Sequence, residues 1–131
     1  MSTSSIREKN MDALRRFFKD DFHSAERRSL WAKDALFEMP WELGGPVAIR
    51  GRDAIMAESD EWWTRLEANR FYDLVIFETS DPDVFWVTVK SETVEKSTHA
   101  TRITDFVNYF RLRDGEVAHR IEYFNPSAHP R

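Results

Sequence analysis

The chain has 131 residues, of which 41% are hydrophobic and 32% charged, a composition typical of one globular domain and too apolar for disorder. Its net charge of -4 argues against a nucleic-acid surface, and the absence of cysteine excludes disulfides and cysteine-ligated zinc. The chain opens without a basic segment followed by an apolar run, and no stretch approaches the length of a membrane span. The expected location is therefore the cytoplasm.

The first part of the chain predicts two helices. Ser5 and Glu8 fit a capping box, so a helix is expected over residues 5–21, with residues 1–4 disordered before it. A short second helix is expected after Ser24. The hydrophobic residues that recur at helical spacing are Met11, Leu14, Phe18 and Phe22.

The middle of the chain predicts two short strands and a third helix. Residues 35–41 form a strand that Pro40 closes, and residues 47–49 form another after a Gly-Gly-Pro turn. A helix is expected over residues 52–68. Its helical stripe is made of Ile55, Ser59, Trp62, Trp63 and Leu66.

Four longer strands are expected after the third helix, and short turns join them. The predicted strands cover residues 71–79, 84–95, 99–113 and 116–124, with a hairpin at Asp114-Gly115. Short turns favour an antiparallel meander over parallel crossovers. The sequence thus predicts one α+β domain over residues 1–131.

Two of these strands are apolar on both faces instead of alternating. They contain Val75-Ile76-Phe77 and Phe85-Trp86-Val87. Because a strand that is apolar on both sides is covered on both sides, we expect helices on one face and a second copy on the other. The homodimer would form through the outer sheet face with Trp86 in contact. The alternative is that Trp86 is simply half exposed.

No motif for phosphate, hydrolase or metal chemistry is present, and the four histidines lack metal-ligand spacing. No metal or cofactor is expected, so any chemistry is acid–base work by side chains. Glu122 stands out among aromatic neighbours, where desolvation would raise its pKa and suit it to proton transfer. The competing interpretation is strand alternation, which places Glu122 on a solvated face beside Arg120.

Other polar and aromatic residues have two readings each. Glu38 and Glu42 either supply a second carboxylate or are solvated loop residues. Asn108 shares a face with Phe106 and Phe110, so its amide either points into a pocket or is satisfied in the core. The tyrosines are interpreted as packing or interface residues, and Trp62 and Trp63 as core and pocket wall.

Several segments resemble the phenazine-biosynthesis PhzA/PhzB proteins, from about residue 46 to 126. The combination of an Ile-Phe-Glu-Thr-x-Asp-Pro segment with a terminal Glu-x-x-Asn-Pro is fairly specific. The matching segments are Val47–Asp53, Ile76–Pro82, Phe85–Val87, Asn108–Arg111, Asp114-Gly115 and Glu122–Pro126.

The resemblance implies an NTF2-like, SnoaL-like fold: a cone of helices packed in a strongly curved, mostly antiparallel sheet around one pocket, and a homodimer. It implies a catalytic Glu at Glu122 and a His at the position of Glu58, so this chain departs from the family's catalytic pair. A broader resemblance to ketosteroid isomerases places Met39 where those proteins carry an Asp base, which argues against steroid-type isomerisation.

The leading hypothesis is a cofactor-independent enzyme of the isomerase or cyclase type that acts on a small planar or cyclic carbonyl compound. Glu122 would move a proton while Asn108 or an indole N–H supports the oxyanion. The alternatives are a ligand-binding module without catalysis and a dimerisation domain. Besides the catalytic Glu122, the expected binding residues are Glu58, Asn108, Trp41, Trp62, Phe106 and Phe110. The sequence names neither substrate nor pathway.

Overall fold

The computed structural model describes residues 2–19 and 25–126, and this part of the chain has the predicted order α-α-β-β-α-β-β-β-β. None of the helices described is both long and apolar enough to cross a bilayer. The helices are α1 (Thr3–Phe17), α2 (Ala25–Leu30) and α3 (Arg52–Thr64). The strands are β1 (Trp31–Met39), β2 (Val47–Arg50), β3 (Leu66–Glu78), β4 (Val84–Glu95), β5 (Thr101–Arg113) and β6 (Glu116–Phe124).

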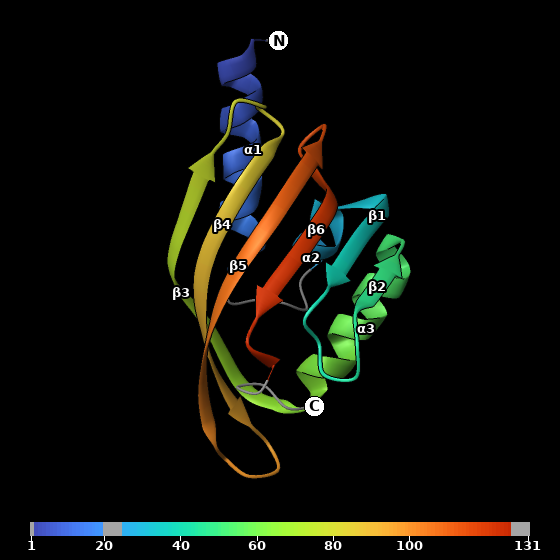
Figure 1. The fold of residues 1–131 in the computed structure, drawn as a ribbon, viewed down its shortest axis with the longest axis vertical. Helices are drawn as coiled ribbons and strands as arrows, with labels where there is room; N and C mark the ends of the chain where they lie inside the picture. The colour runs from blue at the N-terminus through green and yellow to red at the C-terminus, as the bar shows by residue number, and fades with distance from the viewer. Residues whose placement is uncertain (1, 20–24, 127–131) are drawn as a thin grey trace.

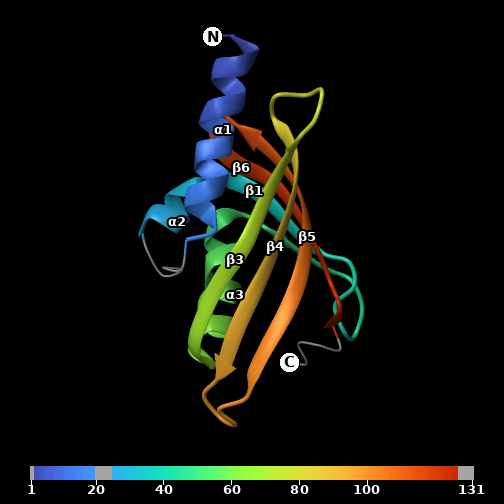
Figure 2. The ribbon, with the colours of Figure 1, turned by 90° about the vertical axis from the view of Figure 1, so that its left-hand side faces the viewer.

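The strands form one sheet in the order β2-β1-β6-β5-β4-β3. Strands β1 and β6 run parallel, and every other neighbouring pair is antiparallel. Figures 1 and 2 show the sheet curving strongly, with the three helices on its concave side. The expected α+β fold with a curved, mostly antiparallel sheet is therefore confirmed.

The first helix begins two residues earlier than expected. Ser2 is its N-cap, and the Ser2 hydroxyl accepts a hydrogen bond from the backbone N–H of Ser5 at 3.2 Å. The helix therefore takes in Thr3 and Ser4, which were expected to be disordered. The expected contribution of Phe22 and the cap at Ser24 lie outside the described residues.

Sheet pairing also changes the bounds of α3 and β1. Helix α3 ends at Thr64 instead of residue 68, because the segment from Leu66 onward already pairs with the end of β4, Leu66 opposite Glu95. Strand β1 begins at Trp31, which pairs with Val117 of β6, and it ends just before Pro40. Long-range backbone hydrogen bonds override local periodicity at these ends.

The core lies between α1, α2 and the concave face of the sheet. Phe17 of α1 is 1% exposed, and its ring centroid lies 5.3 Å from Phe18, 5.3 Å from Trp31 and 5.5 Å from Phe110. All three contacts are edge-to-face, the arrangement that aromatic rings favour. Aromatic residues thus fill one continuous core, and many of the aromatic residues of this chain serve to pack it.

Asn10 ties α1 to the turn between β3 and β4. It is 1% exposed, and its amide nitrogen donates to the Pro82 carbonyl at 3.0 Å and to Asp83 Oδ1 at 2.9 Å. Asn10→Ala is expected to lower the free energy of unfolding by about 1–3 kcal/mol, because both acceptors lose their donor. Urea unfolding measures this. The control is Asp12→Ala on the exposed side of α1, with an expected change below about 0.5 kcal/mol; equal effects of the two would contradict the role given to Asn10.

Candidate functional site

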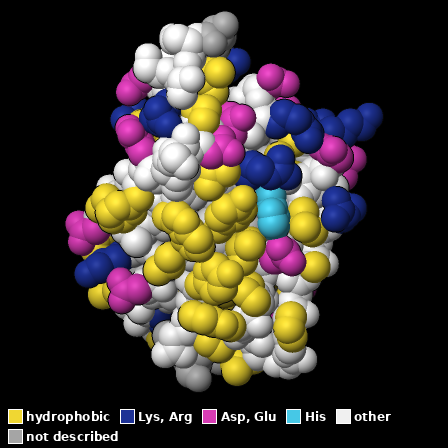
Figure 3. All heavy atoms as spheres, turned by 45° about the horizontal axis from the view of Figure 1, so that its top comes forward, with side chains coloured by type: hydrophobic (Ala, Val, Ile, Leu, Met, Phe, Trp, Pro, Cys, Tyr) yellow, Lys and Arg dark blue, Asp and Glu magenta, His cyan; other side chains and the backbone are white. Residues whose placement is uncertain are grey.

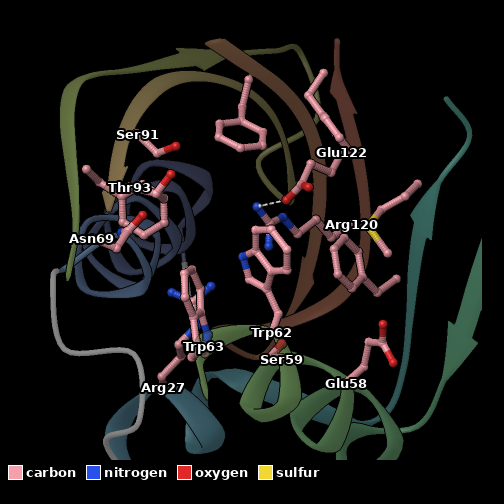
Figure 4. Close-up of a pocket in the computed structure, with 15 residues that line it drawn as sticks. Arg27, Glu58, Ser59, Trp62, Trp63, Asn69, Ser91, Thr93, Arg120 and Glu122 are labelled. Atoms are coloured by element: carbon pink, nitrogen blue, oxygen red, sulfur yellow. Dashed lines mark ion pairs between the residues drawn. The ribbon is translucent and has the colours of Figure 1, made fainter. Parts of the chain in front are cut away.

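A pocket opens between α3 and the concave face of the sheet (Figure 4). Its inner space is about 80 Å³, roughly half that of an engineered cavity of about 150 Å³ that binds benzene. Side chains of α2, α3, β1, β3, β4, β5 and β6 line it. A ligand larger than one ring therefore requires some of these side chains to move.

Helix α3 supplies one wall of the pocket. Glu58, Ser59, Trp62 and Trp63 all line it. Their spacing of one, three and one residues keeps them on one face of a helix, because neighbours three and four apart lie side by side. The stripe seen in the sequence therefore faces a cavity and not only the core.

Strand β6 supplies the charged groups. Arg120 and Glu122 share a face, as strand alternation requires, and a guanidinium nitrogen of Arg120 lies 2.7 Å from Glu122 Oε2. Their side chains are 6% and 14% exposed, so this face is the inner one. The alternative of a solvated Glu122 is therefore wrong. That alternative correctly placed Glu122 on the same face as Arg120, but this polar face of β6 lines the interior.

Arg120 is embedded among core groups. Its Nε donates to Asn108 Oδ1 at 3.0 Å, and its guanidinium lies 4.9 Å from the ring centre of Phe37. Burial lowers the pKa of Arg120, and the charge of Glu122 opposes that shift. The sequence interpretation of Glu122 considered desolvation alone, whereas the structure places a positive counter-charge beside the carboxylate.

Arg27 of α2 is a second buried guanidinium at the pocket. It donates to the backbone carbonyl of Phe17 and lies 4.1 Å from the centre of the Phe17 ring. Burial, together with the positive charge of Arg120, lowers the pKa of Arg27 to about 9, and the charge of Glu122 acts in the opposite direction. Arg27 thus adds positive charge to the pocket at neutral pH.

The expected site residues divide into two groups. Glu122, Glu58, Trp62 and Phe106 all line the pocket. The remaining three, Asn108, Phe110 and Trp41, do not.

Each of these three has a physical reason for lying elsewhere. Asn108 and Phe110 are both 0% exposed; Asn108 holds Arg120 from behind the pocket, and Phe110 belongs to the aromatic core. Trp41 is 58% exposed, because the chain turns outward after Pro40 and the indole packs on Tyr123, 5.0 Å between ring centroids. These positions correct the expectation of pocket contacts.

Of the two alternatives for Glu38, the structure excludes a second carboxylate of the pocket. Its carboxylate lies 2.6 Å from His119 Nε2, and both residues are on the outer face of the sheet, since Phe37 and Arg120 pair with their side chains inward. The second carboxylate of the pocket is Glu58. Glu38 lies between the buried Phe37 and Met39 on β1, so strand alternation predicts that its side chain points outward.

Sequence reasoning missed Arg27, Asn69, Ser91 and Thr93. The latter three sit at inward positions of β3 and β4, where Asn69 pairs with Thr93 in register. Ser91 and Thr93 alternate with Glu92 and so share a face with the buried Val89. The alternation along β4 indicates that Ser91 and Thr93 share the inner face, but two hydroxyl groups on an otherwise apolar face are not by themselves typical of a binding site.

The chain is similar to known proteins in both sequence and fold. A family model described as phenazine biosynthesis protein A/B matches residues 2–131. Phenazine biosynthesis protein PhzB1 of Pseudomonas aeruginosa is 26% identical over 136 residues, which cover 93% of this chain and 78% of PhzB1. The crystal structure of a phenazine biosynthesis-related protein, PhzB2, from the same species superposes with a TM-score of 0.79 at 23% identity, covering 94% of this chain and 83% of that one.

Two further solved structures share the fold. An NTF2-like protein from Anabaena variabilis gives a TM-score of 0.70 at 11% identity, with 93% of this chain and 88% of that chain covered. TerC, co-crystallised with polyporic acid, gives 0.74 at 22% identity, with 92% and 93% covered. The fold is NTF2-like, and the match over residues 2–131 shows that the chain belongs to the phenazine biosynthesis protein A/B family.

Proposed function

We propose that this protein is a cofactor-independent acid–base catalyst of the isomerase or cyclase type, acting on a small cyclic carbonyl compound with Glu122 as the base. One observation carries the proposal: the Glu122 carboxylate faces a ring-lined pocket and is held 2.7 Å from the guanidinium of Arg120. A carboxylate fixed in this way accepts a proton without first having to be ordered.

The proposed reaction is a proton transfer through an enolate. Glu122 removes a proton from the carbon next to the carbonyl, and the electron pair of the broken C–H bond moves into the carbonyl group. The developing oxyanion is stabilised by the positive guanidinium of Arg120 or by the indole N–H of Trp62. Asn108, expected earlier to do this, instead positions Arg120. When a carbon–carbon double bond of the substrate is conjugated with the enolate, return of the proton to the far carbon of that double bond shifts the double bond and completes an isomerisation.

Glu58 defines how this chain departs from the family's pattern. It lines the pocket from α3, at the position where the resemblance to the phenazine proteins implies a histidine. A carboxylate lacks the N–H donors of an imidazole ring, so Glu58 does not replace the histidine one for one. The resemblance to the phenazine proteins implies a condensation reaction that forms the phenazine skeleton. Because Glu58 replaces the histidine, we favour isomerisation or cyclisation for this chain.

The pocket suits a planar ring. Trp62, Phe71, Phe106 and Phe124 line it, and aromatic rings pack well against planar ligands. Because the inner space is only about 80 Å³, single-ring cyclic enones are the probes that we propose. The alternative function is ligand binding without catalysis, favoured by the replacement of the histidine with Glu58.

Solvent-proton exchange tests the proposal without knowledge of the natural substrate. The protein is incubated in D₂O with a panel of cyclic enones, and deuterium at the carbon next to the carbonyl is followed by NMR. Exchange above the buffer rate that falls in Glu122→Gln supports catalysis. Binding of the same compounds without any enhanced exchange favours the ligand-binding alternative.

We also propose that the protein is a homodimer through the outer face of the sheet. This face bears an outer apolar patch, over which hydrophobic side chains gather in Figure 3. The patch consists of Val75, Phe77, Trp86, Val107, Tyr109 and Tyr123, and the first four are 41–50% exposed. An apolar patch set against its own copy is self-complementary, as two-fold interfaces require.

Trp86→Lys is expected to dissociate this dimer. Trp86 lies within the patch, with its ring centroid 5.6 Å from Tyr109, so a charge there raises the dimer dissociation constant by at least about 30-fold. Sedimentation velocity measures the change. Ile103→Lys is the matched control, because Ile103 is 57% exposed on the same face but pairs with Glu92 outside the patch. A Trp86→Lys protein that sediments like the wild type would refute this interface.

A further inference from the structure

The pocket contains a second polar region opposite the ion pair. Asn69 of β3 and Ser91 and Thr93 of β4, here called the neutral cluster, lie together on one side of the cavity in Figure 4, and Arg120 and Glu122 lie on the other. Asn69 is the register partner of Thr93, and Ser91 occupies the next position on the same face. The cluster is therefore built by strand pairing and not by a loose loop.

The neutral cluster has unmet hydrogen-bonding capacity. Ser91 and Thr93 are each 2% exposed. Within residues 2–19 and 25–126, neither hydroxyl has a hydrogen-bond partner, nor do the amide nitrogen and oxygen of Asn69. Buried polar groups in folded proteins nearly always have such partners. Three unpartnered side chains that line one cavity therefore point to a bound molecule that supplies the missing bonds.

The chemistry of the neutral cluster favours an uncharged ligand group that both donates and accepts hydrogen bonds. None of its three members is charged, and Arg102, the register partner of Thr93, is paired with Glu95 at 2.9 Å. Asn69 offers both a donor and an acceptor, and each hydroxyl does the same. A carbonyl oxygen would leave the Asn69 oxygen unmet, whereas a hydroxyl group satisfies both kinds of partner.

We propose that the neutral cluster is a binding site for a ring hydroxyl, which orients the cyclic ligand so that its opposite edge faces Glu122. The inference rests on the proposed function only in that the same pocket takes a cyclic ligand. Hydrogen bonds at one edge and the Arg120–Glu122 pair at the other fix which ring carbon lies next to the base. Such orientation is a large part of what a catalytic site contributes.

A comparison of phenol with toluene tests the site, because the two molecules have nearly the same shape and differ in a hydroxyl against a methyl group. Toluene is the more apolar, so a pocket without a hydroxyl site prefers toluene. We expect the wild-type protein to bind phenol about tenfold more tightly than toluene. Titration calorimetry measures both affinities.

The triple variant Asn69→Leu, Ser91→Ala, Thr93→Val keeps the approximate volumes and removes the polar groups. It is expected to lose the preference for phenol and to bind toluene more tightly. Thr88→Val is the matched control: Thr88 lies on β4 and pairs with Val107, whose side chain is on the outer face, so the preference persists. Thermal unfolding of the triple variant, expected at or above the wild-type temperature, shows that it folds.

Three binding results would overturn the proposal: toluene binding as tightly as phenol to the wild type, a preference for phenol that survives in the triple variant, or no phenol binding at millimolar concentration. A stability result would overturn it as well. A triple variant that unfolds at a lower temperature would assign the cluster to a structural water network instead. The Glu122→Gln protein is expected to keep the preference for phenol. Loss of the hydroxyl site and loss of the catalytic role of Glu122 are therefore separate results.

Discussion

Glu122→Gln is expected to reduce the rate of enzyme-promoted proton exchange by at least about 100-fold. The substitution keeps the shape of the side chain and its ability to accept a hydrogen bond from Arg120, 2.7 Å away, but removes the basic oxygen. If the protein only binds ligands, affinities change little and no exchange is lost. NMR-detected deuterium incorporation, compared with ligand affinity in the same samples, separates these cases.

The stability of the Glu122→Gln protein needs its own measurement. Arg120 is 5% exposed and is left facing a neutral amide, so the free energy of unfolding is expected to fall by about 1–3 kcal/mol. Glu38→Gln is the matched control, because it alters a carboxylate on the outer face that pairs with His119 at 2.6 Å. Exchange activity that persists in Glu122→Gln, or that falls equally in Glu38→Gln, would remove Glu122 from the role of base.

Most of the fold was predictable from local pattern. Helical spacing located α1 and α3, and the short helix expected after Ser24 is α2. The short turns between the late strands, among them Asp114-Gly115, located the long hairpins, and β4 and β6 have the predicted bounds. The errors lie at element ends such as Thr64, where pairing partners distant in the sequence decide the outcome. Local propensity carries no information about those partners.

The site was less predictable, because the pattern states which residues share a face but not which face is inside. Arg120 and Glu122 were correctly placed together, yet polarity suggested the solvent side. On β5 the reverse holds, since Val107 is 43% exposed and Asn108 is fully buried. In a sheet that encloses a polar pocket and bears an apolar outer patch, the usual rule that apolar residues lie inside fails on both faces.

Phe110→Ala is expected to lower the free energy of unfolding by about 3–5 kcal/mol, the range for truncating a buried aromatic residue. Phe110 is 0% exposed, and its ring contacts Phe17 and Phe18 at centroid distances of 5.5 and 5.8 Å. The guanidinium of Arg120 lies 5.5 Å from the same ring. The variant therefore loses packing between α1 and the sheet, and it also loses the ring that packs against Arg120. Urea unfolding measures the resulting change in the free energy of unfolding.

Phe106→Ala, four residues earlier than Phe110 on the same face of β5, is the informative comparison. Phe106 lines the pocket and packs on Phe124, 5.7 Å between ring centroids, but is only partly buried. Its truncation is expected to cost less, about 1–2 kcal/mol, and to enlarge the pocket so that larger rings bind more tightly. If Phe110→Ala changed ligand affinity with little loss of stability, the pocket would extend to Phe110 as the sequence first suggested. If instead Phe110→Ala lowers stability and Phe106→Ala changes ligand affinity, the pocket ends and the core begins between Phe106 and Asn108.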